Sequence, residues 1–335
     1  MLGKLIVDIA GTELTQIEKK YLSHDLIGGV ILFTRNFENK NQLYNLCKSI
    51  KAIKNEELII FVDYEGGRIQ RFRDGFTKLP SMNLLGKRYD SSPEEAKTFS
   101  RMVGNIIAYE LGTLNIDLSF TPVLDLDYGK SKVISDRSFH HSHEVVSSLS
   151  LELIEGLDEM GFKNVAKHFP GHGFVEADSH IDLPIDNRKI DKNLVDLKPY
   201  IKNINKIDAV MTAHIIYKSV DPHPVCYSDY WINSILRKSL NFKGLIISDD
   251  LLMKGADIGK SVHQRVIDCL ETGCDLALVC NFYDEIPNLL NELEISDSKI
   301  FQNSKISELR KSKVFSKNEK EIYEVAKLNI KSNFN

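Results

Sequence analysis

Eight short apolar runs, most of them separated by helical stretches, are the feature that most constrains the fold of this chain. The runs are residues 4–9, 29–33, 58–63, 116–120, 164–168, 209–213, 244–248 and 275–280. They are almost continuously apolar, which is typical of parallel strands that are covered on both faces. The expected helices include 41–54, 93–111, 144–160 and 261–272, and Gly112, Gly161 and Gly273 follow helical runs where a left-handed cap is expected.

The alternation of strands with helices indicates a parallel sheet, and eight strands are the number that closes a (β/α)8 barrel. An open doubly wound sheet is the alternative, but its first strand usually leads into a glycine-rich phosphate-binding turn. Here the first strand leads into Asp8-Ile9-Ala10-Gly11-Thr12, which lacks that pattern. We therefore predict an α/β fold, a single-domain TIM barrel over residues 1–335, with C-terminal helices at about 298–335 packed on its outside.

Composition excludes several classes of protein. The chain has 335 residues with 43 Lys and Arg against 47 Asp and Glu, and this mild acidity argues against a surface that wraps nucleic acid. None of its apolar runs approaches the roughly 20 residues that span a bilayer. Asp8 follows the N-terminus too soon for a signal-peptide core. Five cysteines, mostly in apolar contexts, suggest reduced thiols and therefore a cytoplasmic protein. From its charge and its apolar runs we expect neither membrane nor nucleic-acid partners.

Ionisable side chains gather where the predicted strands end, which is where barrels of this type carry out their chemistry. These positions include Asp63, Asp125, Lys167, His168, His214, Asp249 and Asp250. Any single one of them is explained equally well by helix capping or by a local ion pair. A barrel that only maintained its shape would not need so many, so the set predicts an active site.

Two segments are the most informative. Lys167-His168-Phe169-Pro170-Gly171-His172-Gly173 forms a shaped loop, followed by Asp178-Ser179-His180. In an extended segment Asp178 and His180 point to the same side, so the carboxylate can orient the imidazole for proton transfer. A surface Asp–His contact remains the alternative. In the second segment, Ser248-Asp249-Asp250, one carboxylate should face the barrel mouth, and the spacing leaves open which one.

These motifs together resemble those of bacterial β-N-acetylhexosaminidases of glycoside hydrolase family 3, the NagZ type. The resemblance rests on the 167–173 loop with Asp178-Ser179-His180, on 63–73, on Asp136-Arg137-Ser138-Phe139, on Met211-Thr212-Ala213-His214 and on 244–251, in the family's order. It implies a (β/α)8 barrel that removes a terminal β-linked N-acetylglucosamine with retention of configuration. The expected substrates are peptidoglycan fragments, N-acetylglucosamine joined to 1,6-anhydro-N-acetylmuramic acid with or without peptide, in cell-wall recycling.

The resemblance also implies a role for each matching residue. Asp249 corresponds to the nucleophile that forms a glycosyl-aspartate intermediate, with Asp250 in support, His180 corresponds to the general acid/base, and Asp178 to its orienting partner. Asp63, Arg71, Arg137, Lys167 and His168 correspond to residues that hold the sugar. Gly171 and Gly173 would serve as hinges of the loop that carries His180. We expect a monomer that needs neither a cofactor nor a metal.

Three other readings remain open at this stage. A histidine acid/base repels phosphate less than a carboxylate does, which makes a β-N-acetylglucosaminide phosphorylase conceivable. Scattered histidines could supply metal ligands for a metal-dependent barrel hydrolase. A non-catalytic sugar-binding barrel would keep Asp63, Arg71 and Arg137 but would have no use for both Asp249 and His180.

Overall fold

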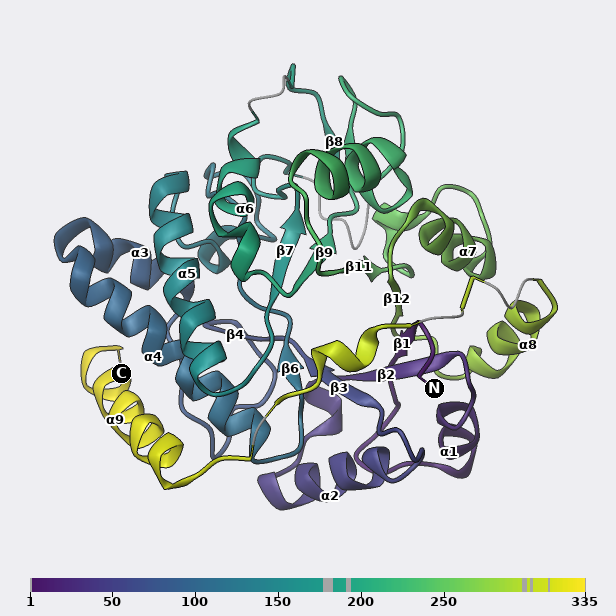
Figure 1. Ribbon diagram of the computed structural model, residues 1–335, viewed down its shortest axis with the longest axis horizontal. Helices are drawn as coiled ribbons and strands as arrows, with labels where there is room; N and C mark the ends of the chain where they lie inside the picture. Colours follow the sequence, from purple (N-terminus) through teal and green to yellow (C-terminus); the bar gives the residue numbers. More distant parts are fainter. Residues whose placement is uncertain are drawn as a thin grey trace.

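Eight parallel strands form one sheet that curves into a barrel, and helices surround it (Figure 1). The computed structural model describes residues 2–176, 183–190, 194–296, 300–301, 304–312 and 314–334. In order around the sheet, the strands are β6 (Leu118–Ser119), β3 (Ile59–Val62), β2 (Ile27–Leu32), β1 (Leu5–Val7), β12 (Leu276–Val279), β11 (Leu245–Asp250), β9 (Ala209–Thr212) and β7 (Val165–Phe169). A parallel bridge between Val123 and Lys167 joins the two ends of this order. The predicted TIM-barrel fold is confirmed.

In the described residues one helix follows each barrel strand, with one additional helix between β3 and β6 and one more near the carboxyl terminus. They are α1 (Gln16–Leu22), α2 (Lys40–Lys51), α3 (Met82–Ser91), α4 (Pro93–Gly112), α5 (His143–Glu159), α6 (Lys198–Asn203), α7 (Val262–Thr272), α8 (Ile286–Ser296) and α9 (Lys317–Phe334), with a π-helix at Tyr230–Ser239. Two short pairs of strands, β4 (Tyr64–Gly66) with β5 (Ile69–Gln70) and β8 (Ile185–Asp186) with β10 (Ile216–Tyr217), lie outside the barrel sheet. None of the described helices is long and apolar enough to cross a membrane.

Local sequence explains several helix boundaries. The Thr15 side chain accepts the Glu18 N–H at the start of α1, and Glu18 reaches back to the Thr15 N–H, so the two residues cap each other. Gly273 ends α7 with φ of 114°, as predicted. The prediction for Gly112 is wrong, because this residue is the last of α4 rather than a left-handed cap. Its missing side chain makes room for Phe315, which a Cβ at Gly112 would approach to 2.7 Å.

The chain after α8 packs against the barrel in two regions, first at the amino-terminal end of the strands and then along α4. Ile306, in a short 3-10 helix (Ile306–Leu309), is fully buried against Gly28 and Gly29 at the amino-terminal end of β2. Ser304 fixes this contact, since its hydroxyl donates to the Gly3 carbonyl oxygen at 2.9 Å. Farther on, α9 packs along α4 on the outside of the barrel (Figure 1). The amino-terminal end of the barrel is therefore covered, and the opposite end carries the polar residues.

Candidate active site

One cavity of about 690 Å³ lies at the carboxyl ends of the barrel strands. This is the size range of small-molecule sites. Its lining includes six of the eight side chains predicted for the site, which are Asp63, Arg71, Arg137, Lys167, His168 and Asp249. Apolar side chains form other parts of the wall, namely Ile31, Phe120, Met211 and Leu278. The six predicted residues, which are up to 186 positions apart in the sequence, thus meet at one site.

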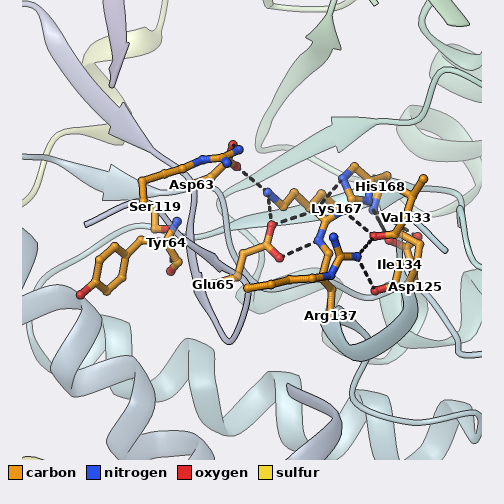
Figure 2. Close-up of polar contacts among 12 residues, drawn as sticks. Asp63, Tyr64, Glu65, Ser119, Asp125, Val133, Ile134, Arg137, Lys167 and His168 are labelled. Atoms are coloured by element: carbon orange, nitrogen blue, oxygen red, sulfur yellow. Dashed lines mark hydrogen bonds and ion pairs between the residues drawn. The ribbon is translucent and has the colours of Figure 1, made fainter. Parts of the chain in front are cut away.

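Three cations and two carboxylates form a continuous network at this cavity, and Figure 2 labels four of its members, Asp63, Glu65, Arg137 and Lys167. The Lys167 ammonium lies 2.8 Å from Asp63 Oδ1 and 2.6 Å from Glu65 Oε1. Arg71 Nη2 donates to Asp63 Oδ2 at 3.1 Å. Arg137 binds Glu65 through two parallel hydrogen bonds of 2.8 Å, the geometry in which a guanidinium holds a carboxylate most firmly. The network fixes where each donor points before a ligand enters.

The two carboxylates of this network stay ionised. Burial alone would raise the pKa of Glu65, but Arg137 and Lys167 outweigh it and lower the pKa to about 2. Burial opposes ionisation at Asp63 too, and Lys167 and Arg71 again lower its pKa below the ordinary value. Asp63 remains partly exposed to the cavity, with 18% of its side chain accessible. It can therefore accept a hydrogen bond from a hydroxyl group of a bound ligand.

A carboxylate–histidine pair, Asp125 and His168, lies beside the network. Asp125 Oδ2 is 2.7 Å from His168 Nδ1, while His168 Nε2 is 3.4 Å from the Arg137 guanidinium. Because a guanidinium can only donate, Nε2 is the acceptor in that contact and Nδ1 carries the proton. Asp125 also accepts the His172 N–H at 2.6 Å, which anchors the start of the 171–176 loop. Since Arg137 faces Nε2, His168 is poorly placed to deliver a proton to a ligand.

Asp249 and Asp250 end β11 in different environments. Asp250 Oδ1 accepts the N–H groups of Leu252 and Cys280, so its side chain is tied to the backbone. Burial raises the pKa of Asp250 to about 7. Burial acts against ionisation of Asp249 too, but the neighbouring His214 and His168 and the Asp250 N–H, which donates to Asp249 Oδ1 at 2.8 Å, outweigh it and lower the pKa. Asp249 is thus the ionised carboxylate of the pair.

His214, two residues after the end of β9, contacts the backbone at the end of β11. Its Nε2 lies 2.9 Å from the Asp250 carbonyl oxygen, so Nε2 donates a hydrogen bond to the peptide that follows Asp250. Its Nδ1 then accepts from the Cys226 thiol at 3.4 Å. Burial lowers the pKa of His214. The imidazole therefore fixes the strand end rather than exchanging protons with a ligand.

The loop after β7 is only partly described. Gly171 and Gly173 take no left-handed conformation, and both lie against neighbouring groups: a Cβ at Gly171 would meet Asp196 at 2.7 Å, and one at Gly173 would meet the Leu126 carbonyl oxygen at 1.7 Å. Close packing therefore favours glycine at both positions, and the hinge role expected for them stays a prediction. Glu176 lines the cavity at the end of this described stretch. The predicted acid/base pair, Asp178 and His180, lies outside the described residues.

Two members of the site had no role assigned to them from sequence. Glu65 and Asp125 both follow predicted strands, and that was the signal available. Their partners lie 72 and 43 residues away, so the pairings depend on the fold. As for metal binding, no group of three or more His, Cys, Asp or Glu residues in the described part of the chain is arranged to hold an ion.

Comparison with known proteins identifies the family. The sequence model described as "Glycosyl hydrolase family 3 N terminal domain" matches residues 3–307. A β-hexosaminidase of Methylobacillus flagellatus is 46% identical over 295 residues, covering 88% of this chain and 84% of its relative. A β-hexosaminidase of Neisseria meningitidis serogroup A is 48% identical over 299 residues, covering 88% and 83%.

Solved structures agree with the sequence matches. NagZ from Neisseria gonorrhoeae in complex with N-trifluoroacetyl-D-glucosamine superposes with a TM-score of 0.91 at 42% identity, covering 99% of this chain and 97% of that one. The β-N-acetylglucosaminidase of Paenibacillus sp. FPU-7 has a TM-score of 0.81 at 28% identity, but this chain spans only 60% of it. The chain therefore belongs to glycosyl hydrolase family 3 and is a glycoside hydrolase of the β-hexosaminidase type.

Proposed function

We propose that this enzyme removes terminal β-linked N-acetylglucosamine with retention of configuration, through a covalent glycosyl ester on Asp249. The observation that carries the proposal is the place of Asp249 on the cavity wall, next to Asp250, whose Oδ1 accepts two backbone N–H groups. The lowered pKa of Asp249 supports its role as the nucleophile. Retention requires two displacements at the anomeric carbon, and the first needs an ionised nucleophile. The N-acetylglucosamine derivative bound by the gonococcal relative supports the choice of sugar.

The first displacement forms one bond and breaks another. An Asp249 oxygen attacks the anomeric carbon, the glycosidic C–O bond breaks, and His180 gives a proton to the departing oxygen. Water then attacks the glycosyl ester while His180, now neutral, takes the proton from that water. Asp178 would orient the imidazole and stabilise its protonated form. His180 lies four positions after Glu176, which lines the cavity wall, and four residues of chain span about 14 Å at most.

The charged network would hold the sugar. Asp63 can accept from hydroxyl groups, Arg71, Arg137 and Lys167 can donate to them, and His168 would hold the sugar as part of the cavity wall. Each of the three cations is already paired, so binding a sugar requires little reorganisation of their side chains.

We infer further that the natural substrates are N-acetylglucosaminyl-1,6-anhydro-N-acetylmuramyl fragments and that the enzyme, a monomer, recycles peptidoglycan in the cytoplasm. All five cysteines are free and buried, which is consistent with a reducing compartment. Cation side chains at the cavity rim, Arg68 and Lys132, suit the carboxylate of a muramyl group. Cell fractionation, light scattering and the release of N-acetylglucosamine from purified muropeptides test these three points.

Trapping of the intermediate tests the central proposal. The protein is incubated with a slowly turned-over fluorinated N-acetylglucosaminide, digested and analysed by mass spectrometry. We expect one sugar adduct on the peptide that contains Asp249, and no adduct in the Asp249→Asn variant. An adduct on another carboxylate, or active protein that never carries one, would overturn the assignment.

The identity of the sugar product distinguishes hydrolysis from phosphorolysis, and two further observations test the metal-dependent and binding-protein alternatives. With phosphate present, we expect free N-acetylglucosamine in the β configuration; a sugar 1-phosphate would instead identify a phosphorylase. Loss of activity on chelation, restored by zinc, would favour metal-dependent chemistry. A sugar that binds without being cleaved would identify a binding protein.

A further inference from the structure

The segment proposed to carry the acid/base pair leaves the described fold after Glu176 and rejoins it at Leu183. The residues on its two sides meet at one side chain, Arg188. Its guanidinium carbon lies 4.1 Å from the centre of the Phe174 ring, which precedes the segment. Its nitrogens bind the Asp186 carboxylate, which follows the segment, at 2.6–3.1 Å. Arg188 therefore joins the two ends of a loop of eleven residues, 175–185.

This junction is itself fixed to the barrel. Arg188 Nη1 donates to Asp196 Oδ2 at 3.0 Å and to the Tyr128 hydroxyl at 3.2 Å, and that hydroxyl donates to Asp196 at 3.0 Å. The Tyr128 ring packs edge-on against Phe174, with centroids 5.4 Å apart. We call Arg188, Phe174, Asp186, Asp196 and Tyr128 the stem clamp.

The chemistry of the clamp explains why its centre is an arginine. A planar guanidinium can bind a carboxylate through two parallel hydrogen bonds and lie over an aromatic ring at the same time, whereas an ammonium cannot. Asp186 and Asp196 are almost completely buried, each with 1% of the side chain exposed, and Arg188 is the cation that contacts both. The guanidinium thus has four partners that come from both sides of the loop and from the barrel.

Fixing the ends of a loop reduces the number of conformations available to the residues between them. A general acid contributes only when it reaches the departing oxygen in the right geometry. We propose that Arg188, through the stem clamp, is a positioning residue for acid/base catalysis by the 175–185 loop. This inference rests on the proposed role of His180, and it adds a residue outside the cavity to the machinery of the reaction.

The test uses the dependence of rate on the leaving group. With 2,4-dinitrophenyl N-acetylglucosaminide the leaving group departs without a proton, whereas N,N′-diacetylchitobiose needs protonation. Because kcat/KM reports the first displacement, misplacement of the acid lowers it for the disaccharide alone. We expect Arg188→Lys and Phe174→Leu each to lower kcat/KM for the disaccharide about 10-fold and for the aryl glycoside less than 2-fold.

Arg101→Gln is the matched control. Arg101 also bridges two carboxylates, Glu152 and Glu159, but on the surface of α4 and α5. It should leave both values unchanged. Melting temperatures of all variants separate misfolding from mispositioning, and Phe174→Leu keeps every ion pair of the clamp. Equal losses on both substrates, or no loss in either clamp variant, would overturn the inference.

Variants of His180 separate this inference from the proposed function. His180→Ala should lose activity on the disaccharide selectively, by more than the clamp variants, and Arg188→Lys should then cost nothing further in the His180→Ala background. If His180→Ala shows no selectivity, the proposed acid/base role fails. If it shows the selectivity and the clamp variants do not, only the role of Arg188 fails.

Discussion

Single residues in this site act through their neighbours. Lys167 is balanced by Asp63 and Glu65, and Arg137 is balanced by Glu65. A buried charge without its partner is costly, so the role of each cation depends on the carboxylate beside it. Each carboxylate of the network contacts two cations, and Glu65 is the more buried of the two, so its loss takes a buried counterion from both Arg137 and Lys167.

We expect Glu65→Gln to raise KM for aryl N-acetylglucosaminides about 10-fold and to lower the free energy of unfolding by about 2–4 kcal/mol, because Arg137 and Lys167 lose a buried counterion. Steady-state kinetics and urea denaturation measure the two effects. Glu57→Gln is the control, since Glu57 is 55% exposed where it meets Arg310 and should change stability by less than about 0.5 kcal/mol. Unchanged kinetics and stability in Glu65→Gln would contradict the network described above.

The raised pKa of Asp250 makes the free energy of unfolding depend on pH. Its pKa is about 7 in the folded protein but near 4 in an unfolded chain, so its contribution to stability is complete below pH 4, falls from pH 4 to 7 and is constant above. Asparagine does not ionise, and its oxygen can accept the same two N–H groups. We expect Asp250→Asn to be more stable than the natural protein at pH 8, on the order of 2–4 kcal/mol, with the difference vanishing toward pH 4. Calorimetry across this range measures it, and a difference that does not change with pH would show that Asp250 titrates normally.

Among the elements, α4 and α5 make the closest contact between helices. A Cβ at Gly156 would meet the Arg101 carbonyl oxygen at 2.1 Å, and one at Gly104 would meet the Leu153 carbonyl oxygen at 2.3 Å. Asn105 donates to the Gly156 carbonyl oxygen at 2.9 Å across the same contact. The two glycines therefore set the distance between the helices.

We expect Gly156→Ala to lower the free energy of unfolding by about 1–3 kcal/mol, because the added methyl group forces the helices apart. Helix propensity acts in the opposite direction, by about 1 kcal/mol, so a net loss identifies the steric effect. Thr98→Ala on the exposed face of α4 is the control and should not lose stability. Thermal unfolding compares the two, and a stabilised Gly156→Ala protein would show that the helices can separate freely.

The cavity with the ionisable residues lies at the carboxyl-terminal end of the barrel strands, and buried apolar side chains close the amino-terminal end. Ile306 fills the space beside Gly28 and Gly29 at the covered end. We expect Ile306→Ala to cost about 2–4 kcal/mol of stability and to leave kcat/KM within twofold of the natural value, since the cavity lies at the opposite end. Val314→Ala, at a side chain that is 93% exposed, serves as the control. A large loss of kcat/KM in the folded Ile306→Ala protein would show that the two ends are coupled.

The barrel could be predicted from sequence because most of its strands are buried apolar runs, and those that carry polar residues, such as β7 and β11, still begin with apolar ones. The short strands β4, β5, β8 and β10 were not predicted, because two or three residues carry no periodic signal. Gly112 was assigned as a helix cap because a cap and a close contact both favour glycine, and only the position of Phe315 distinguishes them.

The amino-acid sequence by itself determined the order of strands and helices and the residue types that follow each strand, since burial of alternating segments depends on composition within short windows. It also carried the motifs that identify the family. The tertiary structure decided which charges pair, because Arg137 meets Glu65 and Asp125 meets His168 only after the barrel closes. It also decided that the pKa of Asp249 is lowered while that of Asp250 is raised, since the pKa of each depends on burial and on groups brought from other strands.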